Sequence, residues 1–458
     1  MTNKHLQHLY WRAGFGINFQ KLTELSEKSL SENVNILFKE SKNVTLLKVD
    51  TSKFEAFSSD YMKTDANQKR ALQKENRKNS IDLNVAWVHR IFQPKELLRE
   101  RMTLFWANHF VCKAENILHI QDYNHILRKN ALGNFKDFVH EVAKSASMIK
   151  YLNAKQNKKQ SPNENFAREL MELFTLGVGN YTENDIKESA KAFTGWSHDA
   201  EGNFVLRKGQ HDFEEKTFFG KTDNFNGDDI IDIIVSQKQC ATFICTKIYS
   251  YFVNEEINQT HINELVSVFF PSYDISKLME HIFMADWFYN EKNIGTKIKE
   301  PIELLAGINE IVPITFENDK QLLYLQKMLG QQLLNPENVA GWKGGQNWID
   351  TNTMMLRLKL PSLLLNNAVI SLSGISEFED TYEQFVKNKK NRKSYLKITA
   401  DWEAFHNNIN IEKTSEYQNL VLQGKLSPNA VQLLSEIKFS TPKEYCIQLM
   451  SLPEYQLC

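Results

Sequence analysis

The sequence predicts a mainly α-helical protein, with a large helical body, one small β-hairpin excursion and a helical C-terminal appendage. Apolar residues recur at helical spacing over most of the 458 residues. After Trp196 the pattern changes to two short apolar runs, NFVLRKG and KTFFGKT, which predict the hairpin or an extended excursion. No linker rich in proline, glycine or serine divides the chain. We therefore expect a core domain over residues 1–370 that carries all the motifs below, and an appendage over residues 371–458.

The first third of the chain predicts consecutive helices. A helical stripe of apolar residues runs up to Pro94, which ends it. The next segment, ELLRERMTLFWANHFV at residues 96–111, predicts a second helix with His109 on an aromatic side. Two further helices are predicted at residues 117–132 and 135–144.

The central stretch NENFARELMELFTLGVGNYTENDIKESAKAFTGW combines paired carboxylates, an arginine and helix-ending glycines in one window. Phenylalanine and leucine recur at helical spacing over residues 163–176, so this segment predicts one amphipathic helix. At about 100° per residue, Glu169 and Glu172 project from one polar shoulder of that helix, and Arg168 flanks Glu172. The stretch is therefore our first candidate for a functional site.

A second helix is predicted to follow directly after a glycine turn. Gly177 and Gly179 can take the left-handed conformation that ends a helix, and Thr182 with Asp185 matches a capping box. Residues 330–348 form a long irregular loop, and ordered loops of this length usually carry function or wrap a site. The remaining helical patterns lie at residues 227–252, 261–270, 275–283, 301–311, 320–330 and 353–366.

Charge and hydropathy exclude two classes of protein. Lys+Arg 55 against Asp+Glu 56 gives a net charge of −1, so there is no overall basic field to recruit nucleic acid. The basic runs at residues 69–78 and 387–393 are predicted to be solvated faces. No apolar run reaches the roughly 18 residues that a membrane span requires, and the N-terminal segment has no signal-peptide core. Five cysteines in no metal-binding pattern suit reduced thiols, so we expect a cytoplasmic protein, with export in company with a partner left open.

The paired carboxylates of the central helix allow three kinds of chemistry. Glu169 and Glu172 can bind a divalent metal ion, act as a general acid and base, or pair with arginines across a helix interface. Arg168 in the same helix favours the third interpretation. The spacing alone leaves all three open.

The segment after the first apolar run places a histidine beside an acid. His211 and Asp212 are adjacent, and Lys216 follows. A histidine that titrates near neutrality and a flexible lysine suit acid/base work or anion binding. The alternative is a hydrogen-bonded loop histidine without a catalytic role.

Three further side chains are candidate binding residues. His109 either is a core histidine with one satisfied nitrogen or contributes to a site. Trp342 and Trp348 frame the glycines of GWKGGQNW, where they can stack against a planar or sugar-like ligand, or pin the loop.

Five motifs stand out in order along the chain: LYWRAGFG, LRERMTLFWANHFV, the central stretch, HDFEEKTFFG and NPENVAGWKGGQNWI. Together they resemble an uncharacterised bacterial family, domain of unknown function 1800. The ordered match runs from about residue 9 to 365. The resemblance implies a mainly helical fold, no agreed reaction, and a protein partner from a family that looks like phosphatases or sulfatases. Relatives often have histidine at the position of Phe174. The motif positions that it implies are Arg12, His109, Asn163, Arg168, Glu169, Glu172, Trp196, His211, Lys216, Gly341, Trp342 and Trp348.

Two hypotheses from different classes follow. In the first, the central helix, the His211 segment and the 330–348 loop converge on one polar cleft of a hydrolase-like protein. Its catalytic residues would be Glu169, Glu172, His211 and Asp212. Its substrate-binding residues would be Arg168, Lys216, His109, Trp342 and Trp348. A divalent metal ion would be bound by Glu169, Glu172 and His211. In the second, the protein is a non-catalytic accessory or scaffold for a partner enzyme, and these residues form a buried Arg–Glu–His network.

Overall fold

The computed structural model describes residues 1–58, 65–366, 369–371, 395–408, 414–437 and 441–458. Within them the fold is mainly α-helical, as the sequence predicts, and the strands form only small antiparallel sheets. No described helix is long and apolar enough to cross a membrane. The basic run at residues 387–393 lies outside the described residues.

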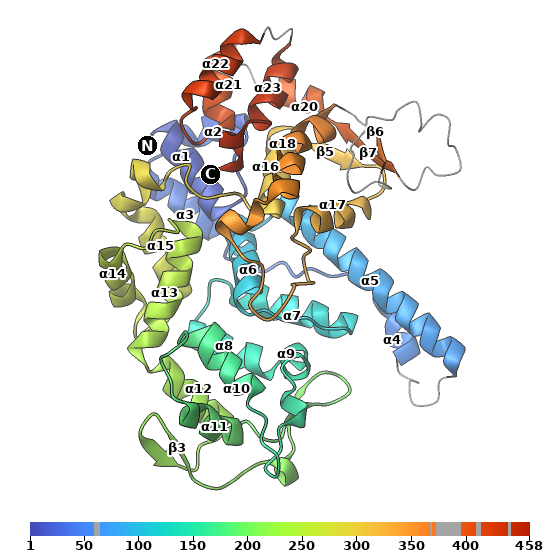
Figure 1. Ribbon diagram of the computed structural model, residues 1–458, viewed down its shortest axis with the longest axis vertical. Coiled ribbons are helices and arrows are strands. Elements are labelled where there is room, and N and C mark those ends of the chain that lie inside the picture. Colours follow the sequence, from blue (N-terminus) through green and yellow to red (C-terminus); the bar gives the residue numbers. More distant parts are fainter. Residues whose placement is uncertain (59–64, 367–368, 372–394, 409–413, 438–440) are drawn as a thin grey trace.

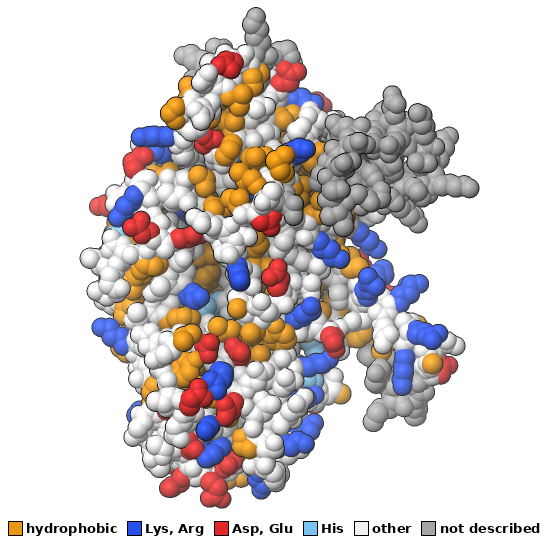
Figure 2. Space-filling model, viewed as in Figure 1, with side chains coloured by type: hydrophobic (Ala, Val, Ile, Leu, Met, Phe, Trp, Pro, Cys, Tyr) orange, Lys and Arg blue, Asp and Glu red, His pale blue; other side chains and the backbone are white. Residues whose placement is uncertain are grey.

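The N-terminal third builds one end and the middle of the molecule (Figure 1). Its helices are α1 (Asn3–Ala13), α2 (Phe19–Ser26), α3 (Leu30–Glu40), α4 (Ser52–Ser58), α5 (Ala66–Phe92), α6 (Leu97–His109) and α7 (Ile117–Asn130). The outer end of α5 carries the basic run at residues 69–78, whose lysine and arginine side chains are exposed (Figure 2). There Lys78 pairs with Glu75 and Asp82 of the same helix, so this part of α5 is a solvated charged face, as predicted.

Helix α6 is the central element of the packing. Every residue from Leu97 to Trp106 is buried, including three consecutive charged ones. Glu100 accepts hydrogen bonds from Arg128 of α7 and from the indole of Trp87 in α5. A buried charge is tolerated only with such partners, so these bonds hold α6 against its neighbours.

The middle of the chain forms a separate layer at the other end of the molecule (Figure 1). It comprises α8 (Phe135–Lys144), α9 (Ala146–Tyr151), α10 (Asn165–Glu169), the π-helix η3 (Leu170–Thr175), α11 (Glu183–Ala192) and α12 (Gly227–Val235). Two hairpins lie here where one was predicted. Strand β1 (Trp196–His198) pairs with β2 (Phe204–Leu206), and β3 (Lys216–Phe218) pairs with β4 (Lys221–Asp223). The two predicted apolar runs do not pair with each other, because each finds a closer partner along the chain.

The helix predicted over residues 163–176 is present from Asn165 to Thr175, but it is not of one type throughout. Regular α-helix ends at Glu169 and widens into the π-helix, in which the Leu176 N–H donates to Met171 O, five residues back. Gly177 follows at φ +82° and ends the helix, as predicted. The predicted capping box at Thr182 and Asp185 is confirmed.

From α12 the chain returns through α13 (Lys238–Phe252), α14 (Gln259–Phe269) and α15 (Ile275–Met284) to α16 (Pro301–Ile311), α17 (Gln321–Leu329) and α18 (Thr351–Leu365). The C-terminal helices are α20 (Trp402–Asn408), α21 (Thr414–Val421), α22 (Pro428–Glu436) and α23 (Pro442–Met450). They adjoin the N-terminal helices, since Gln7 donates to Asn419 O.

Residues on both sides of position 370 share one sheet. Strand β7 (Tyr395–Ala400) lies between β5 (Ile314–Phe316) and β6 (Val369–Ser371), antiparallel to both. Further along, Cys458 and Lys297 exchange both backbone hydrogen bonds. The division at residue 370 stays a prediction, but the described part of the appendage packs directly on the body.

Candidate functional site

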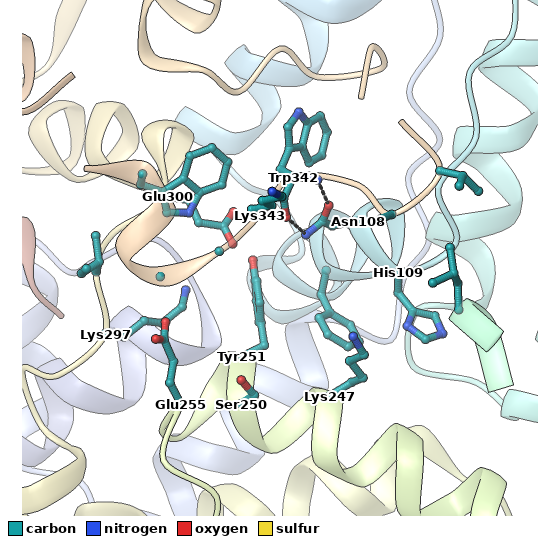
Figure 3. A pocket seen from close by; sticks show the side chains of 18 residues that line it. Asn108, His109, Lys247, Ser250, Tyr251, Glu255, Lys297, Glu300, Trp342 and Lys343 are labelled. Atoms are coloured by element: carbon teal, nitrogen blue, oxygen red, sulfur yellow. Dashed lines mark hydrogen bonds between the residues drawn. The ribbon is translucent and has the colours of Figure 1, made fainter. Parts of the chain in front are cut away.

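A pocket of about 310 Å³ opens beside the C-terminal end of α6 (Figure 3). Five segments of the chain form its walls: α6, the π-helix η3, α13 with the residues just after it, the segment that leads into α16, and the long loop before α18. It is lined by Phe105, Asn108, His109, Leu173, Lys247, Ser250, Tyr251, Glu255, Lys297, Ile298, Glu300, Val339, Ala340, Trp342, Lys343, Gly344, Gly345 and Trp348. The loop predicted to wrap a site therefore does line a pocket.

The loop is held against α6 by a single side chain. Asn108 donates from Nδ2 to Trp342 O at 3.1 Å and accepts from Trp342 N at 2.7 Å (Figure 3). The adjacent Gly341 has φ +79°, and a Cβ built there would lie 2.3 Å from Asn108 Oδ1. Only glycine allows this approach. The pocket wall is thus set by a glycine and an asparagine that the sequence separates by more than two hundred residues.

His109 is a neutral histidine with a defined tautomer. Its side chain is 7 % exposed, and burial lowers its pKa to about 3. The Nε2 atom lies 2.9 Å from Phe174 O, and because a carbonyl oxygen can only accept, Nε2 carries the proton. The other nitrogen, Nδ1, is then a lone-pair acceptor, and no donor among the described residues pairs with it.

An ion cluster lies at the back of the pocket. Glu303 of α16 is buried, accepts hydrogen bonds from Lys297 Nζ at 3.0 and 3.1 Å and pairs with Arg101 of α6. Burial by itself would raise the pKa of Glu303, but Arg101 and Lys297 together lower it to about 2. Lys297 also lies 4.3 Å from the ring centre of Tyr251 in the pocket wall.

Glu300 is a second acidic side chain of this cluster, and it lines the pocket. It is 5 % exposed and accepts a hydrogen bond from Gln331 Nε2 at 2.9 Å. Burial raises its pKa against the opposing effect of Lys297. Glu300 and Glu303 thus differ in proton affinity, which is the arrangement that separates a proton donor from a permanent anion.

The pocket carries lysines that no acidic group neutralises. Lys247 of α13 and Lys343 of the loop form no ion pair among the described residues. The Lys247 ammonium lies 5.4 Å from the ring centre of Phe243, and its partial desolvation at the pocket wall lowers its pKa. Its charge also lowers the pKa of His109, so the two side chains share one electrostatic environment.

The pocket includes three of the side chains predicted as binding residues, His109, Trp342 and Trp348. The central helix contributes Leu173 to it. The other predicted site residues do not line it, namely Glu169, Glu172, Arg168, His211, Asp212 and Lys216.

The carboxylates of the central helix have other surroundings than the sequence suggested. Arg168 forms its ion pairs with Glu164 and Glu183 rather than with Glu172. Glu172 instead accepts a hydrogen bond from Tyr181 OH at 2.7 Å. Burial, and then the negative charge of Glu172, raise the pKa of Glu169. These glutamates are therefore half-buried neighbours of like charge, as their spacing predicted.

The His211 segment is fastened by hydrogen bonds to α11 and its end. His211 Nδ1 donates to Thr194 O at 2.7 Å, and the Asp212 N–H donates to Thr194 Oγ1 at 2.8 Å. The buried Lys216 donates to Asp212 O and Glu214 O, both at 2.7 Å. Lys216 thus holds its own loop.

No group of three or more histidine, cysteine, aspartate or glutamate side chains in the described residues is placed to hold a metal ion. Glu169, Glu172 and His211, the predicted ligands, are included in that statement.

Sequence reasoning missed Lys247, Lys297, Glu300 and the clamp made by Asn108. One signal was available, because charged residues stand inside otherwise apolar segments in LRERM and KIKEPIE. Charges in such places need buried partners. Nothing in either segment says that the partner lies in the other.

Comparison with protein families gives one match over nearly the whole chain. The model described as "Protein of unknown function (DUF1800)" matches residues 8–457, which includes the appendage. No curated protein and no solved structure matches the chain.

Proposed function

Because the chain belongs to the DUF1800 family, whose description states no reaction, we propose a function from the pocket itself: a hydrolase-like enzyme that acts on a small anionic substrate. The observation that carries the proposal is the excess of basic side chains around the pocket. They are Lys247, Lys343, Lys297, Arg101, Arg12 and Arg357, and the acidic groups near them are Glu255, Glu300 and Glu303.

The basic excess supports an anion because most of these cations are buried. Arg12, Arg101 and Arg357 are each 0 % exposed. Water screens such charges poorly, so their field extends into the neighbouring pocket. Lys247 and Lys343 lie in the pocket wall and would contact the anion directly.

The acid and base of the proposed reaction are Glu300 and His109. In hydrolysis, His109 Nδ1 would accept a proton from the attacking water, and Glu300 would give a proton to the leaving group. A pKa of about 3 makes His109 a weak base in the empty pocket. A bound anion beside Lys247 would raise that pKa, because negative charge favours the imidazolium. His109 would then be basic enough to accept a proton only when the substrate is bound.

The residues predicted from the central helix remain a separate proposal. Glu169 and Glu172, with His211 and Asp212, are candidate catalytic groups outside this pocket. Their use as ligands of a divalent metal also stays a proposal, as do a cytoplasmic location and a partner from a phosphatase- or sulfatase-like family. The pocket mechanism uses none of them.

The test is anion binding by calorimetry, with phosphate, pyrophosphate and citrate as probes, on Lys247→Ala and its control Lys238→Ala. Both lysines are exposed residues of α13, but only Lys247 lines the pocket. We expect saturable binding by wild type and Lys238→Ala, and about tenfold weaker binding by Lys247→Ala, for loss of one charge contact. Hydrolysis of ester and phosphoester panels by wild type, lost in His109→Gln, would then establish the reaction.

Two results would overturn the proposal. One is a wild-type protein that binds none of the probes. The other is equal binding by both lysine variants, which would place the anion elsewhere. Either result would leave the non-catalytic accessory or scaffold protein as the better hypothesis, to be pursued by isolating a partner.

A further inference from the structure

A second, smaller cavity lies on the other side of Trp342. Its volume is about 30 Å³, and α5, α6, α7 and the residues before the glycine-rich loop surround it. Trp342 lines both this cavity and the larger pocket, so one indole separates them. None of the residues that line the small cavity has a role in the proposed hydrolysis, so binding there would be independent of it.

The small cavity contains an asparagine whose amide has no partner. Asn124 of α7 is 1 % exposed, and neither its Nδ2 nor its Oδ1 forms a hydrogen bond with any described residue. A buried amide in this state is costly, and such groups are almost always paired with protein, water or a ligand. The amide therefore offers one donor and one acceptor to an occupant of the cavity.

Three other polar side chains of the wall already donate hydrogen bonds to partners outside the cavity. Tyr123 OH donates to Phe110 O, Ser147 Oγ donates to His119 O, and the Trp87 indole donates to Glu100. No charged side chain lines the cavity. Apart from the thiol of Cys112, the remaining wall is apolar and is made by Ala107, Ala114, Ile120, Leu127, Leu334 and Pro336. An ion in such a place would lose its hydration without compensation.

The loop side of the cavity is built at a conformational cost. Leu334, which lines it, has φ +63°, in the left-handed region that leucine rarely adopts. Its neighbour Leu333 is held by Gln326, whose Oε1 accepts from the Leu333 N–H at 2.9 Å. The wall opposite Asn124 is therefore fixed rather than collapsed onto the free amide.

We propose that this cavity binds a neutral carboxamide group of about the size of acetamide. The ligand carbonyl would accept from Asn124 Nδ2, its N–H would donate to Asn124 Oδ1, and its methyl would contact the apolar wall. Room for roughly two water molecules suits one such group. Water molecules are the alternative occupants, but they would leave the apolar part of the wall without contacts.

The test uses the full chain and acetamide as the probe, titrated by ligand-observed NMR. Four non-hydrogen atoms limit the affinity, so we expect saturable binding with a dissociation constant of roughly 0.1 to 10 mM. Acetate and acetone serve as comparisons, since the first adds a charge and the second lacks the donor. Each should bind at least about tenfold more weakly, for loss of one or both hydrogen bonds.

The variant is Asn124→Leu, with Asn130→Ala as its control on the same helix. Asn130 is also buried, but it donates to Ile126 O and Glu141, so its amide is satisfied. Asn124→Leu should abolish acetamide binding without lowering the melting temperature, because it removes an unpaired polar group. Asn130→Ala should lower the melting temperature and leave binding unchanged.

A second readout does not depend on the variants. Cys112 is the one cysteine that is not fully buried. Burial raises the pKa of the Cys112 thiol, so its alkylation is slow and is followed at alkaline pH. Acetamide in the cavity should slow the reaction with a small thiol reagent further, measured by mass spectrometry. The proposal is overturned if acetamide shows no saturable binding, if Asn124→Leu binds it as well as wild type, or if acetate binds equally well. A crystal soaked in acetamide that shows only water beside Asn124 would overturn it too.

Discussion

The side-chain amide of Asn108 forms both of its hydrogen bonds with the backbone of one residue, Trp342. Because Trp342 lies between the two cavities, this clamp positions the wall of each. The Asn108 amide N–H donates to the Trp342 carbonyl, and the Asn108 amide oxygen accepts from the Trp342 N–H. Aspartate could not replace asparagine, since it cannot donate to the Trp342 carbonyl.

The glycines of the loop provide the first prediction. Gly341→Ala should lower the free energy of unfolding by about 1–3 kcal/mol, because it combines a left-handed φ with a Cβ against Asn108. Gly344→Ala should change it by less than about 0.5 kcal/mol, because Gly344 has φ −79° and no atom within 4 Å of the added Cβ. Urea denaturation of both variants gives the comparison, and equal effects would mean that the loop adjusts freely.

The second prediction concerns the ion cluster of Glu303, Arg101 and Lys297 behind the pocket. Glu303→Gln would leave Arg101 and Lys297 buried without their anion, so we expect a loss of about 3–5 kcal/mol. The control, Glu115→Gln, breaks the exposed pair with Lys150 and should cost at most about 1 kcal/mol. Thermal and urea unfolding measure both. A small loss in Glu303→Gln would show that the cluster is hydrated.

The third concerns the dependence of stability on pH. Burial raises the pKa of Glu310 from 4.5 to about 7, although Asn18 donates two hydrogen bonds to it. Below pH 4.5 the carboxyl is protonated in both states. Between pH 4.5 and 7 the unfolded state loses its proton first, so the group costs stability as the pH rises.

Glu310→Gln keeps the acceptor oxygen and removes this titration. At pH 8 the variant should be more stable than wild type by about 1–3 kcal/mol, and at pH 4 the two should be nearly equal. Melting temperatures across this range test it. A constant difference between variant and wild type would show that Glu310 does not titrate in the folded protein within it.

The fourth prediction concerns Glu169 of the central helix and distinguishes its effect on stability from an effect on activity. The pKa of Glu169 is raised by burial and by Glu172, so its charge also costs stability as the pH rises above 4.5. Glu169→Gln should therefore raise the melting temperature at pH 7 to 8 and have little effect at pH 4. If Glu169 also acts in catalysis, the more stable variant would be inactive, because residues at functional sites often lower stability in order to support activity. A variant less stable than wild type at pH 8 would contradict this account.

Local sequence patterns determined the helices and several of their ends. The predicted segments 135–144 and 301–311 coincide with α8 and α16, and the capping box at Thr182 is present. Such features depend on side chains within one or two turns of each other, which a periodicity or a cap motif records directly.

The site was only partly accessible in this way. The 330–348 loop was predicted to wrap a site and does line a pocket, and His109, for which the sequence left a core role and a site role open, lines it too. The partners of Arg168 and His211 were not foreseen. Arg168 had several glutamates within reach, and only the packing of α11 against α10 decided that Glu183 would pair with it. The widening of the helix after Glu169 was equally invisible, since a π-turn changes the bonding pattern without changing the residue types.

The sequence by itself thus determined which segments are helical, which faces are apolar, and which long irregular loop was expected to line a site. Tertiary structure alone decided that Lys247, Lys297 and Glu300 surround the same space as His109, and that Asn124 is buried without a partner. The physical reason is range. Helical periodicity reports on neighbours a few residues apart, while pocket walls, proton affinities and buried ion pairs arise from contacts between segments hundreds of residues apart.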